Sequence, residues 1–381
     1  MTLTANWSYP NAIRFGAGRL GELPDACASA GIRKPLLVTD KGLAPLPITA
    51  RALDILDAAG LGRAIFSAVD PNPTELNLAD GVETYRKGDH DGVIAFGGGS
   101  GLDLGKLVAF MAGQTRPVWD FEDIGDWWTR ADADAIAPII AVPTTAGTGS
   151  EVGRAGVLTN SETHQKKIIF HPKILPGIVI ADPELTVGMP PEITAGTGMD
   201  AFAHCLEAYC SPHFHPMSHG IALEGMRLVK EYLPRAYRDG SDLEARGQMM
   251  AAAAMGAVAF QKGLGAIHAL SHPIGAMHGT HHGTTNAVVM QPALRFNRSA
   301  IEKRIIRAAA YLDIAGGFDG FHDFVGDMNR MLGIPATLTA LGVTNPDLDA
   351  IVGGALADPS TGGNPVAMTA QNTRALLEAC F

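Results

Sequence analysis

The chain has 381 residues, enough for two domains that each bury a core of their own. Its formal net charge is −10 and it contains no basic run, which argues against nucleic acid or an acidic membrane surface as a partner. The N-terminus shows no signal-peptide pattern and no apolar run is long enough to span a membrane, so we expect a cytoplasmic protein.

The first half of the chain alternates short β-branched runs with amphipathic stretches. The runs cover residues 35–39, 92–96, 137–142 and 177–181, and helical stretches such as 47–59 and 79–87 lie between them. Short apolar strands with intervening helices predict βαβ units and a parallel sheet.

After Pro183 the β-branched runs stop and helical periodicity takes over. It is clear in the segments 221–233, 243–259 and 299–312. We therefore predict an α/β dinucleotide-binding domain over residues 1–184 and an all-helical domain over residues 185–381. The boundary is expected near Asp182-Pro183-Glu184, where a proline follows the last strand.

A glycine-rich segment follows the predicted strand at 92–96 and leads into a helix. It comprises Gly97, Gly98, Gly99 and Ser100, followed by Asp103 and Lys106. Glycines at such a position let the backbone approach a diphosphate, and free N–H groups at the start of the helix bind the anion. The segment is neither GxGxxG nor a P-loop, so a tight strand-to-helix turn is the alternative interpretation.

Two further segments after predicted strands are candidates for cofactor contacts. Asp40 ends the strand at 35–39, where an acidic residue can accept hydrogen bonds from ribose hydroxyls and repel a 2′-phosphate. A helix cap or turn is the alternative role for this aspartate. The segment 143–152 is rich in threonine and glycine, and without other information it is equally well a polar loop.

The segment 263–283 contains five of the 13 histidines of the chain, and histidine is the commonest metal ligand. They are His268, His272, His278, His281 and His282. Upstream, Asp200 and His204 are four residues apart, which places both on one face of a helix. Together the two segments predict a mononuclear metal centre of Asp and His ligands. Spacing alone does not say which of the five histidines bind, and Pro273 is expected to end or kink the helix that carries His268 and His272.

Over nearly its whole length the chain resembles the iron-containing (group III) alcohol dehydrogenases. The resemblance is carried by Ile13–Gly18, by the glycine-rich segment with Asp103 and Lys106, by 143–152, by 198–204 and by 263–283. It implies an N-terminal Rossmann-like domain and a C-terminal all-helical domain, the architecture shared with dehydroquinate synthase, with the metal in the cleft between them.

The resemblance also implies roles for individual residues. The metal ligands would be Asp200, His204, His268 and His282, with His272 as an active-site histidine that is not a ligand and His278 and His281 as bystanders. The NAD-binding residues would be Asp40, Gly97, Gly98, Gly99, Ser100, Asp103, Thr144, Thr145, Thr148 and Lys167. We expect an NAD-linked enzyme that interconverts an alcohol and an aldehyde or ketone, with Fe(II), or alternatively Zn(II), as its metal, and a homo-oligomer, most simply a dimer.

Three departures from better-known members concern the substrate. Arg154 and Gln261-Lys262 stand where small, neutral or amide residues are common, and Val366 follows Asn364-Pro365 where many members have arginine. Arg154 and Lys262 are expected to face the substrate and to bind a distal anionic group, as in an ω-hydroxy acid or its semialdehyde. The alternative is that Arg154 pairs with Glu151 or Asp200 and that Lys262 is solvated.

Two other functions remain open at this point. A lyase of the dehydroquinate synthase type also uses NAD and a divalent metal, but it would need several basic groups for a phosphorylated substrate. A metal-binding protein without enzymatic activity would leave the glycine-rich segment unexplained.

Overall fold

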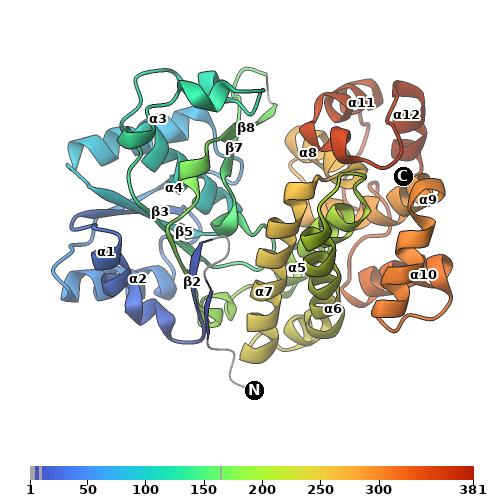
Figure 1. Cartoon of the computed structure of the whole chain (residues 1–381), viewed down its shortest axis with the longest axis horizontal. Coiled ribbons are helices and arrows are strands. Elements are labelled where there is room, and N and C mark those ends of the chain that lie inside the picture. Colours follow the sequence, from blue (N-terminus) through green and yellow to red (C-terminus); the bar gives the residue numbers. More distant parts are fainter. Residues whose placement is uncertain (1–4, 8–10, 164) are drawn as a thin grey trace. The chain divides into compact units, whose positions relative to one another are not determined.

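The computed structural model describes residues 5–7, 11–163 and 165–381 (Figure 1). By its internal contacts the chain divides into two compact units. The first comprises Met1–Thr145 and Gly149–Gly188, and the second comprises Ala146–Thr148 and Met189–Phe381. The sequence placed the boundary after residue 184 and did not foresee that a short piece of the threonine-rich loop packs with the second unit.

The first unit is built on a seven-stranded sheet with the order β1-β2-β9-β6-β5-β3-β4. Its strands are β1 (Ala5–Trp7), β2 (Ala12–Phe15), β3 (Pro35–Asp40), β4 (Ile65–Val69), β5 (Gly92–Gly97), β6 (Ile139–Pro143) and β9 (Ile178–Ala181). Every neighbouring pair is parallel except β1 with β2. The prediction of a parallel sheet in this half of the chain is confirmed.

Helices cover both faces of this sheet, which explains why its central strands are continuous apolar runs. Leu36 and Val38 belong to the core under α3 (Glu75–Lys87) and α4 (Gly99–Met111). Leu37, between them, belongs to the core with α1 (Leu23–Ser29) and α2 (Pro47–Ala58). Successive strand side chains point to opposite faces, so one strand supplies both cores.

Several features of the first unit were not predicted. They are β1, β2, β4 and a hairpin of β7 (Ala155–Thr159) and β8 (Lys166–Phe170) outside the main sheet. In β2 the buried Ile13 and Phe15 alternate with the half-buried Arg14, so the strand lacks the continuous apolar run that marks its neighbours.

The second unit is helical, as predicted, and no strand follows Ala181 among the described residues. Its helices are α5 (Pro191–Cys210), α6 (Pro216–Arg238), α7 (Leu243–Ala259), α8 (Ala266–His278), α9 (His282–Tyr311), α10 (Gly317–Met331), α11 (Leu348–Ala357) and α12 (Ala370–Glu378). Pro273 was expected to end or kink its helix. It does not end the helix, because α8 continues to His278. A proline removes only one backbone donor, and the helix is stabilised by its hydrogen bonds on either side.

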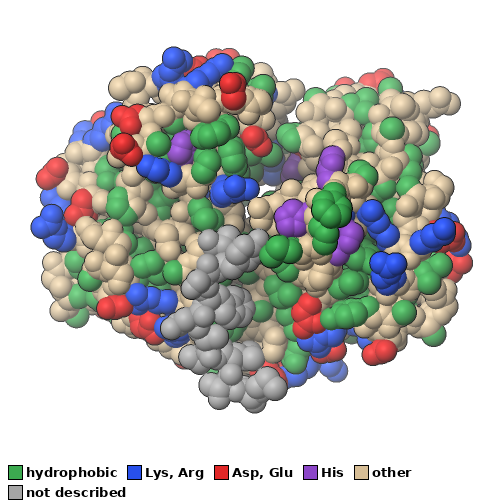
Figure 2. Space-filling view, in the orientation of Figure 1, with side chains coloured by type: hydrophobic (Ala, Val, Ile, Leu, Met, Phe, Trp, Pro, Cys, Tyr) green, Lys and Arg blue, Asp and Glu red, His purple; other side chains and the backbone are tan. Residues whose placement is uncertain are grey.

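Two further observations concern the distribution of charged side chains on the surface and the hydropathy of the helices. Basic and acidic side chains are interspersed on the face shown in Figure 2. Among the described residues, no single helix has the length and hydropathy to cross a bilayer. Leu243–Lys262 together with α8 would satisfy both criteria, with a bend of 109° between them.

The contact of α4 with β5 generates the first prediction. A Cβ added at Gly105 would lie 2.6 Å from Ala95 Cβ and 2.9 Å from its Cα. We expect Gly105→Ala to lower the free energy of unfolding of the first unit by about 1–3 kcal/mol, because the helix must move away from the sheet.

Tryptophan fluorescence during denaturant unfolding measures this effect in the first unit alone, because Trp7, Trp119, Trp127 and Trp128 are the four tryptophans of the chain. Gly21→Ala is the control, since a Cβ there meets no atom of the described residues within 4 Å. Equal unfolding midpoints for the two variants would contradict the prediction.

Candidate metal and cofactor sites

One buried face of α5 carries three polar residues at helical spacing. Asp200 and His204 are four residues apart, Glu207 follows three residues later, and all three are less than 10% exposed. The helix begins with Pro191 in its first turn and is buried continuously from Thr194 to Cys210. A helix buried on all sides fixes these side chains precisely, because none of them can turn toward solvent.

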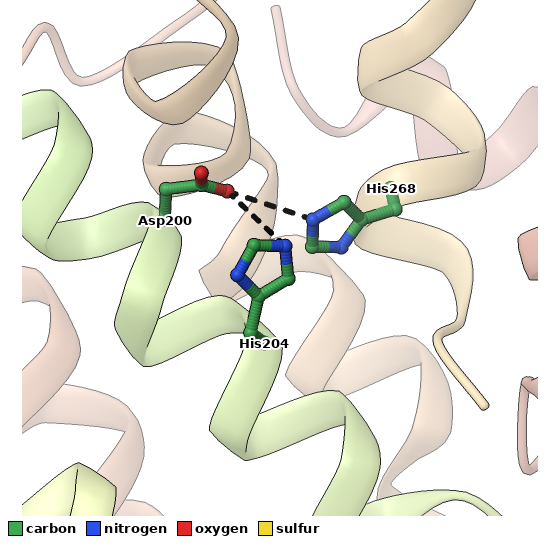
Figure 3. Close-up of side chains that lie close together, drawn as sticks. All are labelled: Asp200, His204 and His268. Atoms are coloured by element: carbon green, nitrogen blue, oxygen red, sulfur yellow. Dashed lines mark ion pairs between the residues drawn. The ribbon is translucent and has the colours of Figure 1, made fainter. Parts of the chain in front are cut away.

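Three histidine rings converge on one carboxylate oxygen of Asp200. The Nε2 atoms of His204, His268 and His282 lie 3.7, 3.6 and 3.5 Å from Asp200 Oδ1. Asp200 and His204 come from α5 and His268 comes from α8 (Figure 3). Asp200, His204 and His268 form a buried cluster whose ligand atoms all lie within 4.8 Å of one another.

These separations are those of ligands around an ion. Metal–nitrogen bonds of about 2.0–2.1 Å in a tetrahedral arrangement place neighbouring ligand atoms roughly 3.4 Å apart. Good hydrogen bonds to a ring nitrogen would be shorter, at about 2.7–3.2 Å. The donor set of one carboxylate and three imidazoles therefore fits a divalent metal.

The charges of the cluster also favour a cation. Burial opposes the ionisation of Asp200, but the three histidines lower the pKa of this carboxyl well below its usual range. Burial lowers the pKa of His204 to about 4, which keeps that ring neutral with a free lone pair. Burial acts in the same direction on His268, but the Glu207 and Asp200 carboxylates outweigh it and raise its pKa to about 9. A protonated His268 thus balances the two buried carboxylates, and a bound metal ion would take the place of that positive charge.

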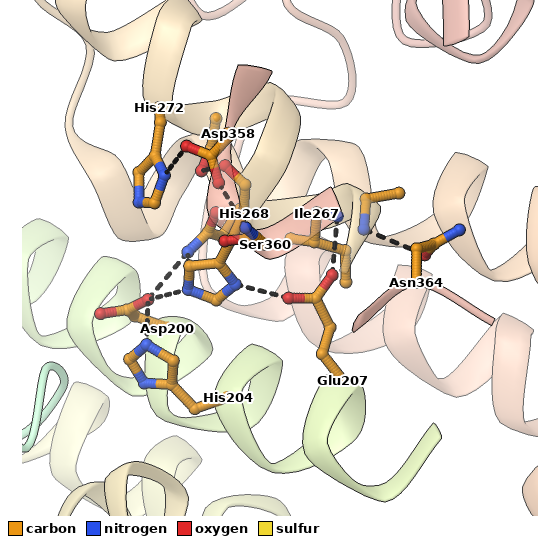
Figure 4. A network of polar contacts seen from close by, with 12 residues as sticks. Asp200, His204, Glu207, Ile267, His268, His272, Asp358, Ser360 and Asn364 are labelled. Atoms are coloured by element: carbon orange, nitrogen blue, oxygen red, sulfur yellow. Dashed lines mark hydrogen bonds and ion pairs between the residues drawn. The ribbon is translucent and has the colours of Figure 1, made fainter. Parts of the chain in front are cut away.

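Two residues that the sequence did not single out contact the cluster. Glu207 Oε2 accepts a hydrogen bond from His268 Nδ1 at 2.5 Å, as Figure 4 shows. The buried Asn286 on α9 donates from Nδ2 to Asp200 Oδ1 at 2.8 Å. The same Nδ2 lies 3.2 Å from His268 Nε2 and 3.1 Å from His282 Nε2.

His272 is held beside the cluster by a carboxylate of its own. Its Nδ1 donates to Asp358 Oδ2 at 2.7 Å, and its ring stacks on that of His282 with centroids 5.2 Å apart. Burial works against ionisation of Asp358, but the hydrogen bond from His272 lowers the pKa of this carboxyl. The side chain of His272 is 20% exposed, so a proton at Nε2 can exchange with solvent.

His278 and His281, the expected bystanders, lie on either side of the turn between α8 and α9. His278 is in the last turn of α8. His281 is the N-cap of α9, and its Nδ1 accepts a hydrogen bond from Thr284 N at 3.3 Å. The helix cap gives His281 a structural role.

In the first unit, the glycine-rich segment has the predicted position between a strand and a helix. Gly97 ends β5 with φ of 147°, Gly98 is the N-cap of α4, and α4 begins at Gly99. Ser100 lies in the first turn and donates from Oγ to Pro71 O at 2.6 Å. Residues that carry a side chain rarely adopt the φ of Gly97. The sharp turn that exposes the first N–H groups of α4 therefore requires glycine at this position.

Asp40 and the threonines lie at the same ends of the parallel strands. Asp40 Oδ1 accepts from the backbone N–H groups of Gly42 and Leu43, so it stabilises a turn, and Oδ2 lies beside Gly97.

Thr145 packs against Gly98, and the buried Oγ1 of Thr144 has no hydrogen-bond partner among the described residues. A buried hydroxyl beside a glycine turn fits a ligand that supplies the missing partner.

Two charged residues proposed for cofactor binding have contacts within the first unit. Asp103 accepts from Ser150 Oγ at 2.5 Å and from Val157 N at 3.1 Å, and it pairs with the buried Lys106 at 3.3 Å. The contacts with Ser150 and Val157 tie α4 to β7 and to the loop before it. Lys167 on β8 pairs with Glu122 at 3.2 Å and remains about one-third exposed.

The two cations proposed for the substrate have different environments. Arg154 is exposed, and its guanidinium lies 5.6 Å from the centre of the Phe170 ring. Lys262 is only 3% exposed, and its Nζ donates to the carbonyls of Ala208 at 2.8 Å, Tyr209 at 3.2 Å and Ser211 at 2.5 Å.

The expectation that Lys262 faces the substrate is therefore corrected. Its ammonium stabilises the C-terminus of α5, where free carbonyls and the helix dipole attract a cation. Burial and the neighbouring Arg304 lower the pKa of Lys262 to about 8, so the group still carries its charge at neutral pH.

Three residues that contact the site were not identified from the sequence: Glu207, Asn286 and Asp358. A sequence pattern could have identified the first two but not the third. Glu207 follows His204 by three residues and Asn286 follows His282 by four, so helical spacing alone would have placed each beside a ligand. Asp358 lies 86 residues from His272, and no local pattern connects them.

The position of Lys262 gives the second prediction. Lys262→Met keeps the length of the side chain but removes the donors to the end of α5. We expect the free energy of unfolding of the second unit to fall by about 1.5–3 kcal/mol, as for other hydrogen bonds to a charged group. Calorimetry measures the stability, and the ratio of kcat/KM for an ω-hydroxy acid to that for a neutral alcohol should stay unchanged. A normal melting temperature with a lost preference for the acid would restore Lys262 to the substrate site.

Comparisons with known proteins identify the family of the chain. Residues 10–183 match the family model of iron-containing alcohol dehydrogenase, and residues 194–381 match the C-terminal model of the same family. A 4-hydroxybutyrate dehydrogenase from Cupriavidus necator is 41% identical over 97% of this chain and 98% of its own length. A 1,3-propanediol dehydrogenase from Klebsiella pneumoniae is 35% identical over 99% of this chain and 98% of its own length.

Solved structures show the same fold over the full length. The crystal structure of a 1,3-propanediol oxidoreductase gives a TM-score of 0.93 at 34% identity and covers 100% of both chains. That of a sulfoacetaldehyde reductase from Bifidobacterium kashiwanohense in complex with NAD+ gives 0.88 at 30% identity, with 100% of this chain and 98% of the other covered. The family matches favour the dehydrogenase over the lyase alternative. The chain belongs to the iron-containing alcohol dehydrogenase family.

Proposed function

We propose that this chain is an NAD-linked alcohol dehydrogenase in which Asp200, His204, His268 and His282 bind Fe(II), and that its substrate is a short ω-hydroxy acid or the matching semialdehyde. The observation that carries the proposal is the convergence of three ring nitrogens on Asp200 Oδ1. Three imidazoles and one carboxylate suit Fe(II) and also Zn(II), and the family favours iron.

The metal held by these four residues would supply polarisation of the substrate oxygen, and a bound nicotinamide would supply the hydride acceptor or donor. His272 acts on the proton of the substrate hydroxyl. Its Nδ1–H is engaged by Asp358, which leaves Nε2 to accept that proton and pass it to solvent. In the reduction of an aldehyde the same atom returns the proton.

The first unit binds the cofactor in this proposal. The N–H groups at the start of α4, from Gly97 to Ser100, bind the diphosphate. Asp40 accepts hydrogen bonds from the ribose hydroxyls and repels a 2′-phosphate, which favours NAD over NADP. Thr144, Thr145 and Lys167 lie along the remainder of the cofactor, and Asp103 supports the loop before β7 through Ser150. The cofactor role of Thr148, which packs with the second unit, stays a prediction.

Two observations support an anionic substrate. The relatives include enzymes named for 4-hydroxybutyrate and sulfoacetaldehyde, and both compounds carry an anionic group. Arg154 offers an exposed guanidinium, which binds a carboxylate or sulfonate through two parallel hydrogen bonds. The dimer and the cytoplasmic location stay predictions.

The third prediction separates the fourth ligand from the proton-transferring histidine. His282→Ala removes a ligand, so metal content after reconstitution with Fe(II) or Zn(II) should fall from one ion per chain toward zero. His272→Ala is the matched control, because its ring stacks on that of His282. It should keep the metal and lose turnover. Elemental analysis measures the metal, and a fully loaded His282→Ala variant would refute this ligand set.

The fourth prediction concerns the substrate. Arg154→Ala should lower kcat/KM for 4-hydroxybutyrate by roughly tenfold to a hundredfold, the cost of one charge-assisted contact. The value for 1-butanol, a neutral alcohol of equal length, should change little.

Arg130→Ala is the control for this experiment. Arg130 is also exposed in the first unit, and its guanidinium lies 4.0 Å from the centre of the Trp127 ring, so its loss changes the net charge equally. If Arg154→Ala and Arg130→Ala show the same preference between acid and alcohol as the parent enzyme, Arg154 does not bind the substrate.

A further inference from the structure

We infer that Glu207 is a positioning residue of the metal site, which sets the tautomer of His268 and fixes α8 against α5. The inference rests on the proposed metal ligands and assigns a role to a residue outside them. Glu207 is 7% exposed and lies on the same face of α5 as Asp200 and His204.

Glu207 uses both of its oxygens on the first turn of α8. Oε2 accepts from His268 Nδ1 at 2.5 Å, and Oε1 accepts from the backbone N–H of Ile267 at 2.7 Å (Figure 4). The preceding backbone N–H of that turn, on Ala266, has no partner within the helix and donates to Asn364 Oδ1 at 3.0 Å. The start of α8 is thus held by side chains from two other segments, and its N-terminal dipole favours the carboxylate.

The hydrogen bond to Nδ1 has a chemical consequence for the opposite nitrogen. A carboxylate only accepts, so when the His268 ring is neutral, as a metal ligand must be, its single proton lies on Nδ1 and Nε2 carries a lone pair. That lone pair faces the position where the ligand atoms converge, 3.6 Å from Asp200 Oδ1. Carboxylates that bind the far nitrogen of a ligand histidine orient the ring and raise its basicity, and their loss typically weakens metal binding tenfold to a hundredfold.

The chain contains a matched pair for comparison. Asp358 binds Nδ1 of His272 as Glu207 binds Nδ1 of His268, but His272 is not among the proposed ligands. Each carboxylate also accepts from a backbone N–H, Asp358 from Ser360 at 2.8 Å. The same isosteric change at the two positions therefore separates an effect on the metal from a general effect of losing a buried carboxylate.

The experiment measures the dissociation constant of Zn²⁺ by competition with a chromophoric chelator. Glu207→Gln has one acceptor oxygen for two donors and should bind Zn²⁺ about tenfold to a hundredfold more weakly than the parent enzyme. Asp358→Asn should bind it with the parent affinity. Glu207→Asp keeps the charge but is shorter by one methylene. It should also bind Zn²⁺ more weakly than the parent enzyme, because the shorter side chain does not reach both donors.

Parent affinity in a folded Glu207→Gln variant overturns the inference while leaving the ligand set intact. A parent chain that binds no stoichiometric Zn²⁺ overturns the proposed metal site and this inference with it.

A second measurement needs no variant. In the zinc-loaded parent with ¹⁵N-labelled histidine, the ring identified by its proximity to the Ile267 amide should carry its proton on Nδ1. A proton on Nε2 of that ring would overturn the inference.

Discussion

The burial of two carboxylates on one face of α5 is the constraint on which the second unit depends. Asp200 is 2% exposed and Glu207 is 7% exposed, so neither is stabilised by water. A buried charge is tolerated only when hydrogen-bond donors or an opposite charge replace the lost solvation. The partners come from two other helices: the rings of His268 and His282, the amide of Asn286 and a backbone N–H of α8. Satisfying these two groups therefore brings together segments that are far apart in the sequence.

The two units meet opposite chemical requirements. The second unit concentrates negative charge and ring lone pairs, which suit a cation. The first unit presents N–H groups at the start of α4 and a buried threonine hydroxyl at the end of β6, which suit an anion or a hydroxyl-bearing ligand. Each arrangement follows from a different secondary structure. Parallel strands end at a common edge where loops and helix starts collect, whereas packed helices direct side chains inward from several sides.

What the sequence could predict depended on whether the signal was local. The i,i+4 pair Asp200 and His204 and the glycine turn at residues 97–100 are patterns that a single element imposes. The choice of His268 and His282 among five histidines needed the family resemblance, because the relative rotation of α8 and α9 decides which rings meet Asp200. The position of Lys262 was predicted incorrectly for the same reason. Its partners are backbone carbonyls at the end of a different helix, and a pattern of side chains does not reveal backbone partners.

Helix α9 contacts α5 near both ends of a long span. Near its start, Asn286 binds Asp200, and 18 residues later Arg304 donates to the carbonyls of Cys210 and Ser211, each at 2.6 Å. Inserting or deleting one residue between these two positions would turn one contact by about 100° relative to the other. The length of this stretch is therefore as constrained as the identity of its end residues. An insertion or deletion of one residue within 287–303 would therefore disturb the geometry around Asp200 even though it touches none of the metal ligands.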